Sequence, residues 1–237
     1  MELFKKSIAE YFGSFILVFI ACGYASIDGG NNVIGISLVF GLVVAGLAYL
    51  FGKVSGAHLN PAVSLASLIN EKMSLKDFSA YVGCQILGTF TGAVAIFGLA
   101  KFFNFDLAGN ACTYVINHKA GLTTETVVES LLVEFFLTFL FIYIVLSIGN
   151  TKTRLKNYSS LIVGATIFFL VLVGIKLTGC SINPARSLAT SLGTAIFNHD
   201  LEALFQVWVF FVGPLGGAAL SAYLYKRLHR DVIVRVI

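Results

Sequence analysis

The tripeptide Asn-Pro-Ala occurs twice in this chain, at Asn60-Pro61-Ala62 and at Asn183-Pro184-Ala185, and the two copies use two of its three prolines. Asn followed by Pro is a typical start of an α-helix, because Asn caps the first turn and Pro fits the first helical position. A capping Asn uses its side-chain oxygen and keeps its amide N–H donors. Two such amides facing one cavity could hold the oxygen of a small polar solute. The alternative is that each Asn only caps a buried helix.

Glu10, Glu134 and Arg186 are charged residues that lie within apolar stretches of the sequence. A charge inside a bilayer is costly, so such residues usually serve a site and face the interior of a helix bundle. Each carboxylate must therefore find hydrogen-bond donors, and a role in proton relay is the alternative. For Arg186, the alternative is an interfacial residue that pairs with lipid headgroups.

The elements that hold these residues are expected to be membrane-spanning helices. The chain is 57% hydrophobic and 12% charged, whereas a soluble domain has about 25% charged residues. A helix that crosses the hydrocarbon core needs about 20 mostly apolar residues. Six stretches qualify, at 8–24, 33–51, 78–99, 127–148, 161–177 and 204–224. We therefore predict an all-α membrane protein with a single transmembrane domain over residues 1–237 and no separate soluble domain.

The two halves of the chain form a repeat, placed at about 1–104 and 125–237. Glu10 precedes its Asn-Pro-Ala motif by 50 residues and Glu134 precedes the second by 49. A Gly-x-x-x-Gly pair also recurs in the third and sixth stretches, at 88–92 and 213–217. Because each half has three spans, an odd number, the second half must enter the membrane from the opposite side, which predicts an inverted repeat.

The apolar runs that follow the two Asn residues, 61–70 and 184–192, are too short to cross the membrane. Ten helical residues rise about 15 Å, half of the hydrocarbon thickness. We therefore expect two half-helices that meet with their N-termini near the midplane, a geometry that makes a pore. The positive end of each helix dipole would repel cations there and orient water so that a proton wire is broken.

Basic residues are distributed unequally between the two sides. If the N-terminus is cytoplasmic, twelve of the sixteen lie inside: Lys5, Lys6, Lys53, Lys72, Lys76, Lys152, Arg154, Lys156, Lys226, Arg227, Arg230 and Arg235. This bias predicts a multi-pass protein of the cell membrane with both termini in the cytoplasm. The basic residues form no cluster on a soluble face, so nucleic acid is not an expected partner. The four cysteines and four histidines lack metal-ligand spacing, so neither a metal site nor a disulfide is predicted.

On these motifs the chain resembles the aquaporin (major intrinsic protein) family over essentially its whole length. The resemblance rests on residues 55–63 (SGAHLNPAV), residues 183–187 (NPARS) and the two symmetric glutamates. It implies a six-helix bundle with two half-helices, a pore through each subunit, a homotetramer and no cofactor.

The resemblance also implies roles for single residues. It places Arg186 at a narrow constriction together with Phe40, Val171 and Cys180. It implies that Glu10 and Glu134 each accept hydrogen bonds from the backbone of the pore loop in their own half. His58 is expected to line the pore through its backbone carbonyl, with a simply packed histidine as the alternative.

The choice of solute depends on the constriction. Water-selective members commonly have His where this chain has Val171, and losing that polar group would widen the aperture. Other positions are of the water type: Ser187 and Ser191 stand where glycerol channels carry Asp and a basic residue, and Phe210-Phe211 replaces their Pro-Leu pair. We therefore expect a passive water channel with a somewhat relaxed filter. The alternative is a channel for small neutral solutes such as glycerol, hydrogen peroxide or ammonia.

Functions of other classes are less well supported by the sequence. An enzyme would need a nucleophile–base pair, a metal set or a phosphate-binding loop, and none is present. A proton- or ion-coupled transporter would need titratable groups along the route, such as Glu10 or Glu134 facing the lumen. A junction-forming membrane protein would need a distinctive outer loop, and residues 102–126 are ordinary.

Overall fold

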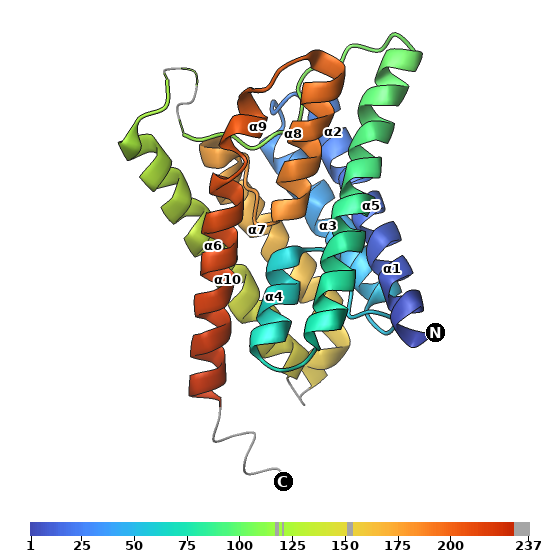
Figure 1. Ribbon diagram of the computed structural model, residues 1–237, viewed down its shortest axis with the longest axis vertical. Helices are drawn as coiled ribbons and strands as arrows, with labels where there is room; N and C mark the ends of the chain where they lie inside the picture. The colour runs from blue at the N-terminus through green and yellow to red at the C-terminus, as the bar shows by residue number, and fades with distance from the viewer. Residues whose placement is uncertain (117–118, 120, 151–153, 230–237) are drawn as a thin grey trace.

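The computed structural model describes residues 1–116, 119, 121–150 and 154–229, and these residues form helices and no strand (Figure 1). Within them, six helical segments are long and apolar enough to cross a membrane. The all-α class with six spans is therefore as predicted. The spans are built from α1 (Glu2–Leu17), a π-helical turn (Val18–Cys22) and α2 (Gly23–Asp28); α3 (Val33–Phe51); α5 (Leu75–Phe102); α6 (Thr124–Asn150); a 3-10 turn (Arg154–Tyr158) and α7 (Ser159–Thr178); and α9 (Glu202–Gln206) with α10 (Val209–Leu228).

Two shorter helices begin at the Asn-Pro-Ala motifs, α4 (Pro61–Ile69) and α8 (Pro184–Asn198). α4 has the expected length, but the expected end of α8 at residue 192 is wrong. Gly193 does not break the helix, because its missing side chain lets α8 press against Phe97; a Cβ atom there would lie 2.6 Å from the Phe97 ring. The helix ends instead at His199, which adopts a left-handed backbone with φ of 57°.

The packing of the helices follows the predicted inverted repeat. α1 packs on α5 in the first half and α6 packs on α10 in the second, while α3 packs on α7 across the two halves. Each half-helix lies against a long helix of the other half, α4 against α10 and α8 against α5. The expected repeat boundaries at about 104 and 125 fall at the two ends of the α5–α6 connection.

Glycines allow the closest of these helix contacts. A Cβ atom on Gly41 of α3 would lie 2.8 Å from the carbonyl oxygen of Gly164 on α7. On Gly88 and Gly217 a Cβ atom would overlap the carbonyl oxygens of Tyr11 and Phe135, respectively. Small residues at such crossings bring helix backbones together in membrane proteins. The predicted Gly pairs therefore have a packing role.

The bundle has two distinct ends. We call the end that carries Met1 the N-face; α4 and the last turns of α10 lie toward it, whereas the α5–α6 connection lies at the opposite face (Figure 1). Of the basic residues assigned to one side of the membrane, Lys152, Arg230 and Arg235 lie outside the described residues.

Candidate pore

The two Asn-Pro-Ala motifs each begin a half-helix with the Asn as its cap. Asn60 has an extended backbone, and its Oδ1 accepts a hydrogen bond from the N–H of Ala62 at 2.8 Å. Asn183 Oδ1 accepts from the N–H of Ala185 at 3.1 Å. The side-chain oxygens are thus used for capping, as predicted, and the amide groups point elsewhere.

Each amide ties its motif to the loop of the other half. Asn60 Nδ2 donates to the carbonyl of Ile182 at 2.9 Å, and Asn183 Nδ2 donates to the carbonyl of Leu59 at 2.8 Å. An amide nitrogen has two hydrogens, so each Asn retains one N–H after this bond. Both residues line a central cavity of about 250 Å³ in which that second N–H can meet a solute.

A second cavity, of about 180 Å³, lies toward the opposite face. The residues that line both cavities are Phe40, Val171, Cys180 and Arg186. These four side chains therefore stand at the junction between the cavities. They are also the four residues that the family resemblance implied at a constriction.

Arg186 is buried in this junction, with 4% of its surface exposed. Its Nη2 lies 3.5 Å from the carbonyl oxygen of Gly179, and its guanidinium carbon lies 5.7 Å from the centroid of the Phe40 ring. Its Nε and Nη1 have no partner among the described residues. Burial rules out an interfacial residue that pairs with headgroups. These N–H groups can therefore donate to a solute at the junction.

Glu10 lies beneath the first loop and accepts hydrogen bonds on both oxygens. Oε1 accepts from Ser55 Oγ at 2.6 Å and from the N–H of His58 at 2.9 Å. Oε2 accepts from the N–H of Leu59 at 2.6 Å and from Gln85 Nε2 at 2.8 Å. The buried carboxylate is thus surrounded by donors, which is how a charge is accommodated in a bundle interior.

Glu134 holds the second loop in the same way. Its Oε1 accepts from Thr178 Oγ1 at 2.6 Å and from the N–H of Ser181 at 2.8 Å, and its Oε2 accepts from the N–H of Ile182 at 2.9 Å. Neither Glu10 nor Glu134 is among the described residues that line the central cavity. Their position therefore offers no support for a proton relay through the cavity.

The loops before the two half-helices have an unusual backbone that these carboxylates stabilise. Ala57 and Leu59 have positive φ of 49° and 53°, and Cys180 and Ile182 repeat the pattern at 52° and 53°. A left-handed backbone costs a non-glycine residue about 1–2 kcal/mol. The bonds from Glu10 and Glu134 to the N–H groups of these loops offset that cost.

His58 lines the central cavity, and its ring is also held in place. Nδ1 lies 3.1 Å from Ser64 Oγ and Nε2 lies 3.4 Å from Ser67 Oγ, while the ring meets that of Tyr81 edge-on. The two predictions for this residue, pore lining and packing, are therefore not exclusive.

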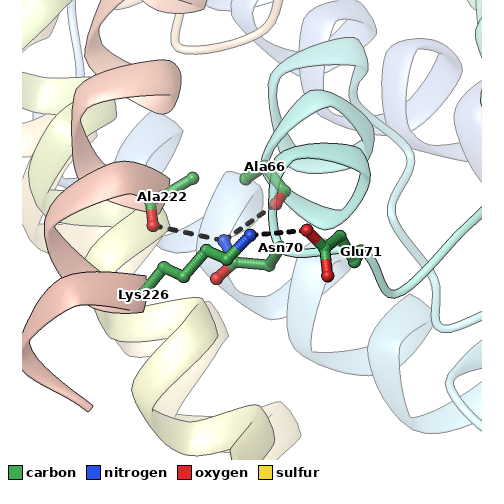
Figure 2. A network of polar contacts seen from close by, with 5 residues as sticks. All are labelled: Ala66, Asn70, Glu71, Ala222 and Lys226. Carbon is green, nitrogen blue, oxygen red and sulfur yellow. Dashed lines mark hydrogen bonds and ion pairs between the residues drawn. The ribbon is translucent and has the colours of Figure 1, made fainter. Parts of the chain in front are cut away.

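The N-face end of α4 is fastened to α10 (Figure 2). Asn70 Nδ2 donates to the carbonyl of Ala66 at 3.0 Å within α4 and to that of Ala222 at 3.4 Å on α10. Next to it, Lys226 Nζ lies 2.7 Å from Glu71 Oε1. The half-helix is thus anchored at both ends, by the crossed Asn pair at its N-terminus and by α10 at its C-terminus.

Comparison with known proteins assigns the family. The family model for "Major intrinsic protein" matches residues 1–225. The chain belongs to the major intrinsic protein family. Members of this family are passive channels and not enzymes, so the described cavities belong to a membrane channel.

Relatives within the major intrinsic proteins have names of both solute types. The chain is 35% identical to Aquaporin Z of Brucella melitensis, over 95% of this chain and 98% of that protein. It is 34% identical to the glycerol uptake facilitator protein-like 6 of Lactiplantibacillus plantarum, over 92% and 95%. The X-ray structure of the aquaglyceroporin from Plasmodium falciparum matches with a TM-score of 0.82 and 25% identity, over 98% of both chains.

Several polar residues that support the pore of this major intrinsic protein did not emerge from the sequence. Gln85 bridges Glu10 and Ser64, and the Tyr81 hydroxyl donates to the carbonyl of Ser55 at 2.8 Å. Cys112, in the α5–α6 connection, lines the cavity toward the opposite face. The position of Gln85 in the middle of an apolar span was a signal in the sequence that its side chain serves a polar site inside the bundle. Nothing near Cys112 in the sequence indicates its position.

Proposed function

We propose that this chain is a passive water channel whose route passes the two Asn-Pro-Ala motifs in the central cavity. The observation that carries the proposal is the junction at Phe40, Val171, Cys180 and Arg186, where two cavities meet beside unpaired guanidinium N–H groups. A water molecule can accept from Arg186 there and from the remaining amide N–H of each Asn further along.

The charges around the route favour neutral solutes. At an effective dielectric constant of about 20, a unit positive charge 4 Å away opposes a cation by about 4 kcal/mol, and Arg186 supplies such a charge at the junction. The N-termini of α4 and α8 add partial positive charges near the two Asn residues. The carboxylates of Glu10 and Glu134, which would attract cations, are engaged outside the cavity lining.

The second candidate is a channel for small neutral solutes such as glycerol. Val171 favours it, because an apolar side chain faces Arg186 where a His would narrow the aperture and add a polar wall. The names of two relatives, a glycerol uptake facilitator protein-like protein and an aquaglyceroporin, are in line with this candidate.

The ratio of two permeabilities separates the candidates. Stopped-flow light scattering on reconstituted vesicles gives the osmotic water permeability from a shrinking phase and the glycerol permeability from the recovery of volume. The proposal expects water permeability well above that of empty vesicles and slow glycerol recovery. Rapid glycerol recovery with water permeability at the level of empty vesicles would overturn it in favour of the second candidate.

We further propose that the N-face is cytoplasmic in the cell membrane and that four subunits assemble. The excess of basic residues expected on the N-face supports the orientation. Exposed apolar side chains on α3 and α7, such as Leu42 and Phe169, support lateral packing within the bilayer. Accessibility of terminal tags in intact and opened cells tests the orientation. Light scattering in detergent tests for a particle of four 25.5 kDa chains.

A further inference from the structure

Three buried hydroxyl groups near the second Asn-Pro-Ala motif form a continuous chain of hydrogen bonds. Thr113 Oγ1 donates to Ser187 Oγ at 2.9 Å, and Ser187 Oγ lies 2.7 Å from Ser181 Oγ. Ser181 Oγ in turn donates to the carbonyl of Asn183 at 3.2 Å. Because each hydroxyl has one hydrogen, Ser187 must donate to Ser181. The bonds therefore run in one direction, from Thr113 to the residue that caps α8.

Each of these hydroxyl residues directly follows a residue that lines a cavity. The preceding residues are Cys112, Cys180 and Arg186. The bond between Ser181 and Ser187 thus connects the backbone next to Cys180 with the backbone next to Arg186. It links two of the four residues at the junction, and the bond from Thr113 adds the α5–α6 connection to the same unit.

The first half of the chain has a corresponding set of hydrogen bonds. The positions two residues before and four residues after the first Asn hold His58 and Ser64, whose Nδ1 and Oγ atoms lie 3.1 Å apart. Ser181 and Ser187 occupy the same two positions around the second Asn. In the first half the third member is Gln85, whose Nε2 donates to Ser64 Oγ at 3.0 Å. That third member comes from a membrane-spanning helix, α5.

The helix α10 cannot provide the corresponding side chain in the second half. By the spacing from the Gly-x-x-x-Gly pairs, Gln85 of α5 corresponds to Phe210 of α10, and a Phe ring cannot donate this hydrogen bond. Phe210 is fully buried. Thr113 supplies the donor instead. The α5–α6 connection therefore makes a contact that the first half obtains from a helix.

Other contacts already hold the connection in place. The N–H of Tyr114 donates to the carbonyl of Thr178 at 3.1 Å. The N–H of Val115 donates to Gln206 Oε1 at 2.7 Å. These bonds fasten the connection to the end of α7 and to α9 without the Thr113 hydroxyl. The hydroxyl of Thr113 is therefore available for a role at the junction.

We propose that Thr113 is a positioning residue for the junction, and that the α5–α6 connection thereby forms part of the solute filter. Its hydroxyl holds Ser187, and through the chain of hydroxyl groups it fixes the separation of Arg186 from Cys180. Without this bond the junction widens, and solutes larger than water pass more readily. The effect on solute choice rests on the proposed water route, whereas the coupling of the connection to the junction does not.

The coupling is tested by hydrogen–deuterium exchange of the purified full chain in neutral detergent. Thr113→Val removes the donor but keeps the branched side chain, so backbone exchange should rise in residues 179–187 as well as in the connection. Thr113→Ser keeps the hydroxyl and should exchange like the parent. The matched control is Thr124→Val, at an exposed position at the start of α6. Unchanged exchange of residues 179–187 in Thr113→Val would overturn the proposal.

The effect on solute choice is tested by the ratio of glycerol to water permeability in reconstituted vesicles. The ratio should rise in Thr113→Val by about two- to tenfold, the range that corresponds to one neutral hydrogen bond. Thr113→Ser and Thr124→Val should keep the ratio of the parent. A purely structural role would lower the unfolding temperature of Thr113→Val and leave this ratio unchanged, and that result would overturn the filter role.

A double variant tests whether Thr113 acts through Ser187. Ser187→Ala removes the same bond, so Thr113→Val combined with Ser187→Ala should raise the permeability ratio no further than Ser187→Ala alone. Additive effects of the two changes would show that Thr113 acts by another path and would overturn the proposal. Absence of water flux in every sample, with the exchange of residues 179–187 still dependent on Thr113, would instead contradict the proposed function.

Discussion

Under the proposed function, the choice of solute depends most on Val171. It is buried at the junction with Arg186 and Phe40 and offers no hydrogen bond. Val171→His would add a polar wall and reduce the aperture. We expect the ratio of glycerol to water permeability to fall by about tenfold, the scale of a small change in a tight pocket.

The control for this change is Ile175→His. Ile175 lies one turn further along α7 and lines the cavity toward the opposite face without reaching the junction. Ile175→His should leave the ratio of glycerol to water permeability unchanged in the same stopped-flow assay. An equal change in both variants would place the solute barrier away from Val171.

Two thiols lie along the proposed route, and they should differ in their effect on flux. Cys180 stands at the junction, whereas Cys112 lines the cavity toward the opposite face but not the central cavity, and burial raises the pKa of its thiol. A mercurial on Cys180 should therefore block water flux, and Cys180→Ser should remove most of the inhibition. Cys84→Ser is the control, because Cys84 lines neither cavity. Inhibition that persists in Cys180→Ser and disappears in Cys112→Ser would show that Cys112, and not Cys180, is the thiol through which mercurials block water flux.

At the scale of elements, the two pore loops depend on carboxylates from α1 and α6. Glu10→Gln or Glu134→Gln keeps the side-chain size but turns an amide N–H toward the donors of the loop. Leaving one buried donor unsatisfied costs about 1–3 kcal/mol. Both variants should lower the thermal unfolding temperature in detergent by similar amounts. The control is Glu129→Gln, at an exposed position of α6. If it lowers the unfolding temperature as much as Glu134→Gln does, the Glu134 carboxylate does not stabilise the second loop.

The contacts between α4 and α10 should contribute unequally (Figure 2). Asn70→Ala removes the bond to Ala222 and should destabilise by about 0.5–1.5 kcal/mol. Glu71→Gln should have little effect at neutral pH, because exposed ion pairs contribute little. A large loss of thermal stability in Glu71→Gln, with none in Asn70→Ala, would reverse this ranking.

The pH dependence of the same pair has a defined sign. Lys226 lowers the pKa of Glu71 below its ordinary value of 4.5. Any stabilisation from the pair is therefore present above about pH 4.5 and is lost as the pH falls through the lowered pKa. Comparing the pH dependence of thermal unfolding between the parent and Glu71→Gln measures this contribution.

The sequence indicated those elements whose signals are local. Asn before Pro marks a helix start at Asn60 and at Asn183, and a carboxylate in an apolar span marks an interior position at Glu10. The length of α8 was missed because Gly193 is a helix breaker by propensity and a packing residue by its contact with Phe97. The left-handed loop residues and the bond from Gln85 to Glu10 were missed because tertiary contacts create them.

At the scale of the whole molecule, the two halves form one route with a cation at each junction. Arg186 stands between the central cavity and the cavity toward the opposite face, and Lys72 lines both the central cavity and a cavity of about 380 Å³ at the N-face. The crossed bonds of Asn60 and Asn183 join the halves at the centre. Under the proposed function, neutral solutes pass along this route without a moving part.

The most direct test of the account measures water and proton flux on the same reconstituted vesicles. The account predicts osmotic water permeability well above that of empty vesicles, with a low activation energy, while proton flux followed by a trapped pH indicator stays at background. Water permeability equal to that of empty vesicles, or proton flux that rises together with it, would contradict a water route between the two Asn-Pro-Ala motifs.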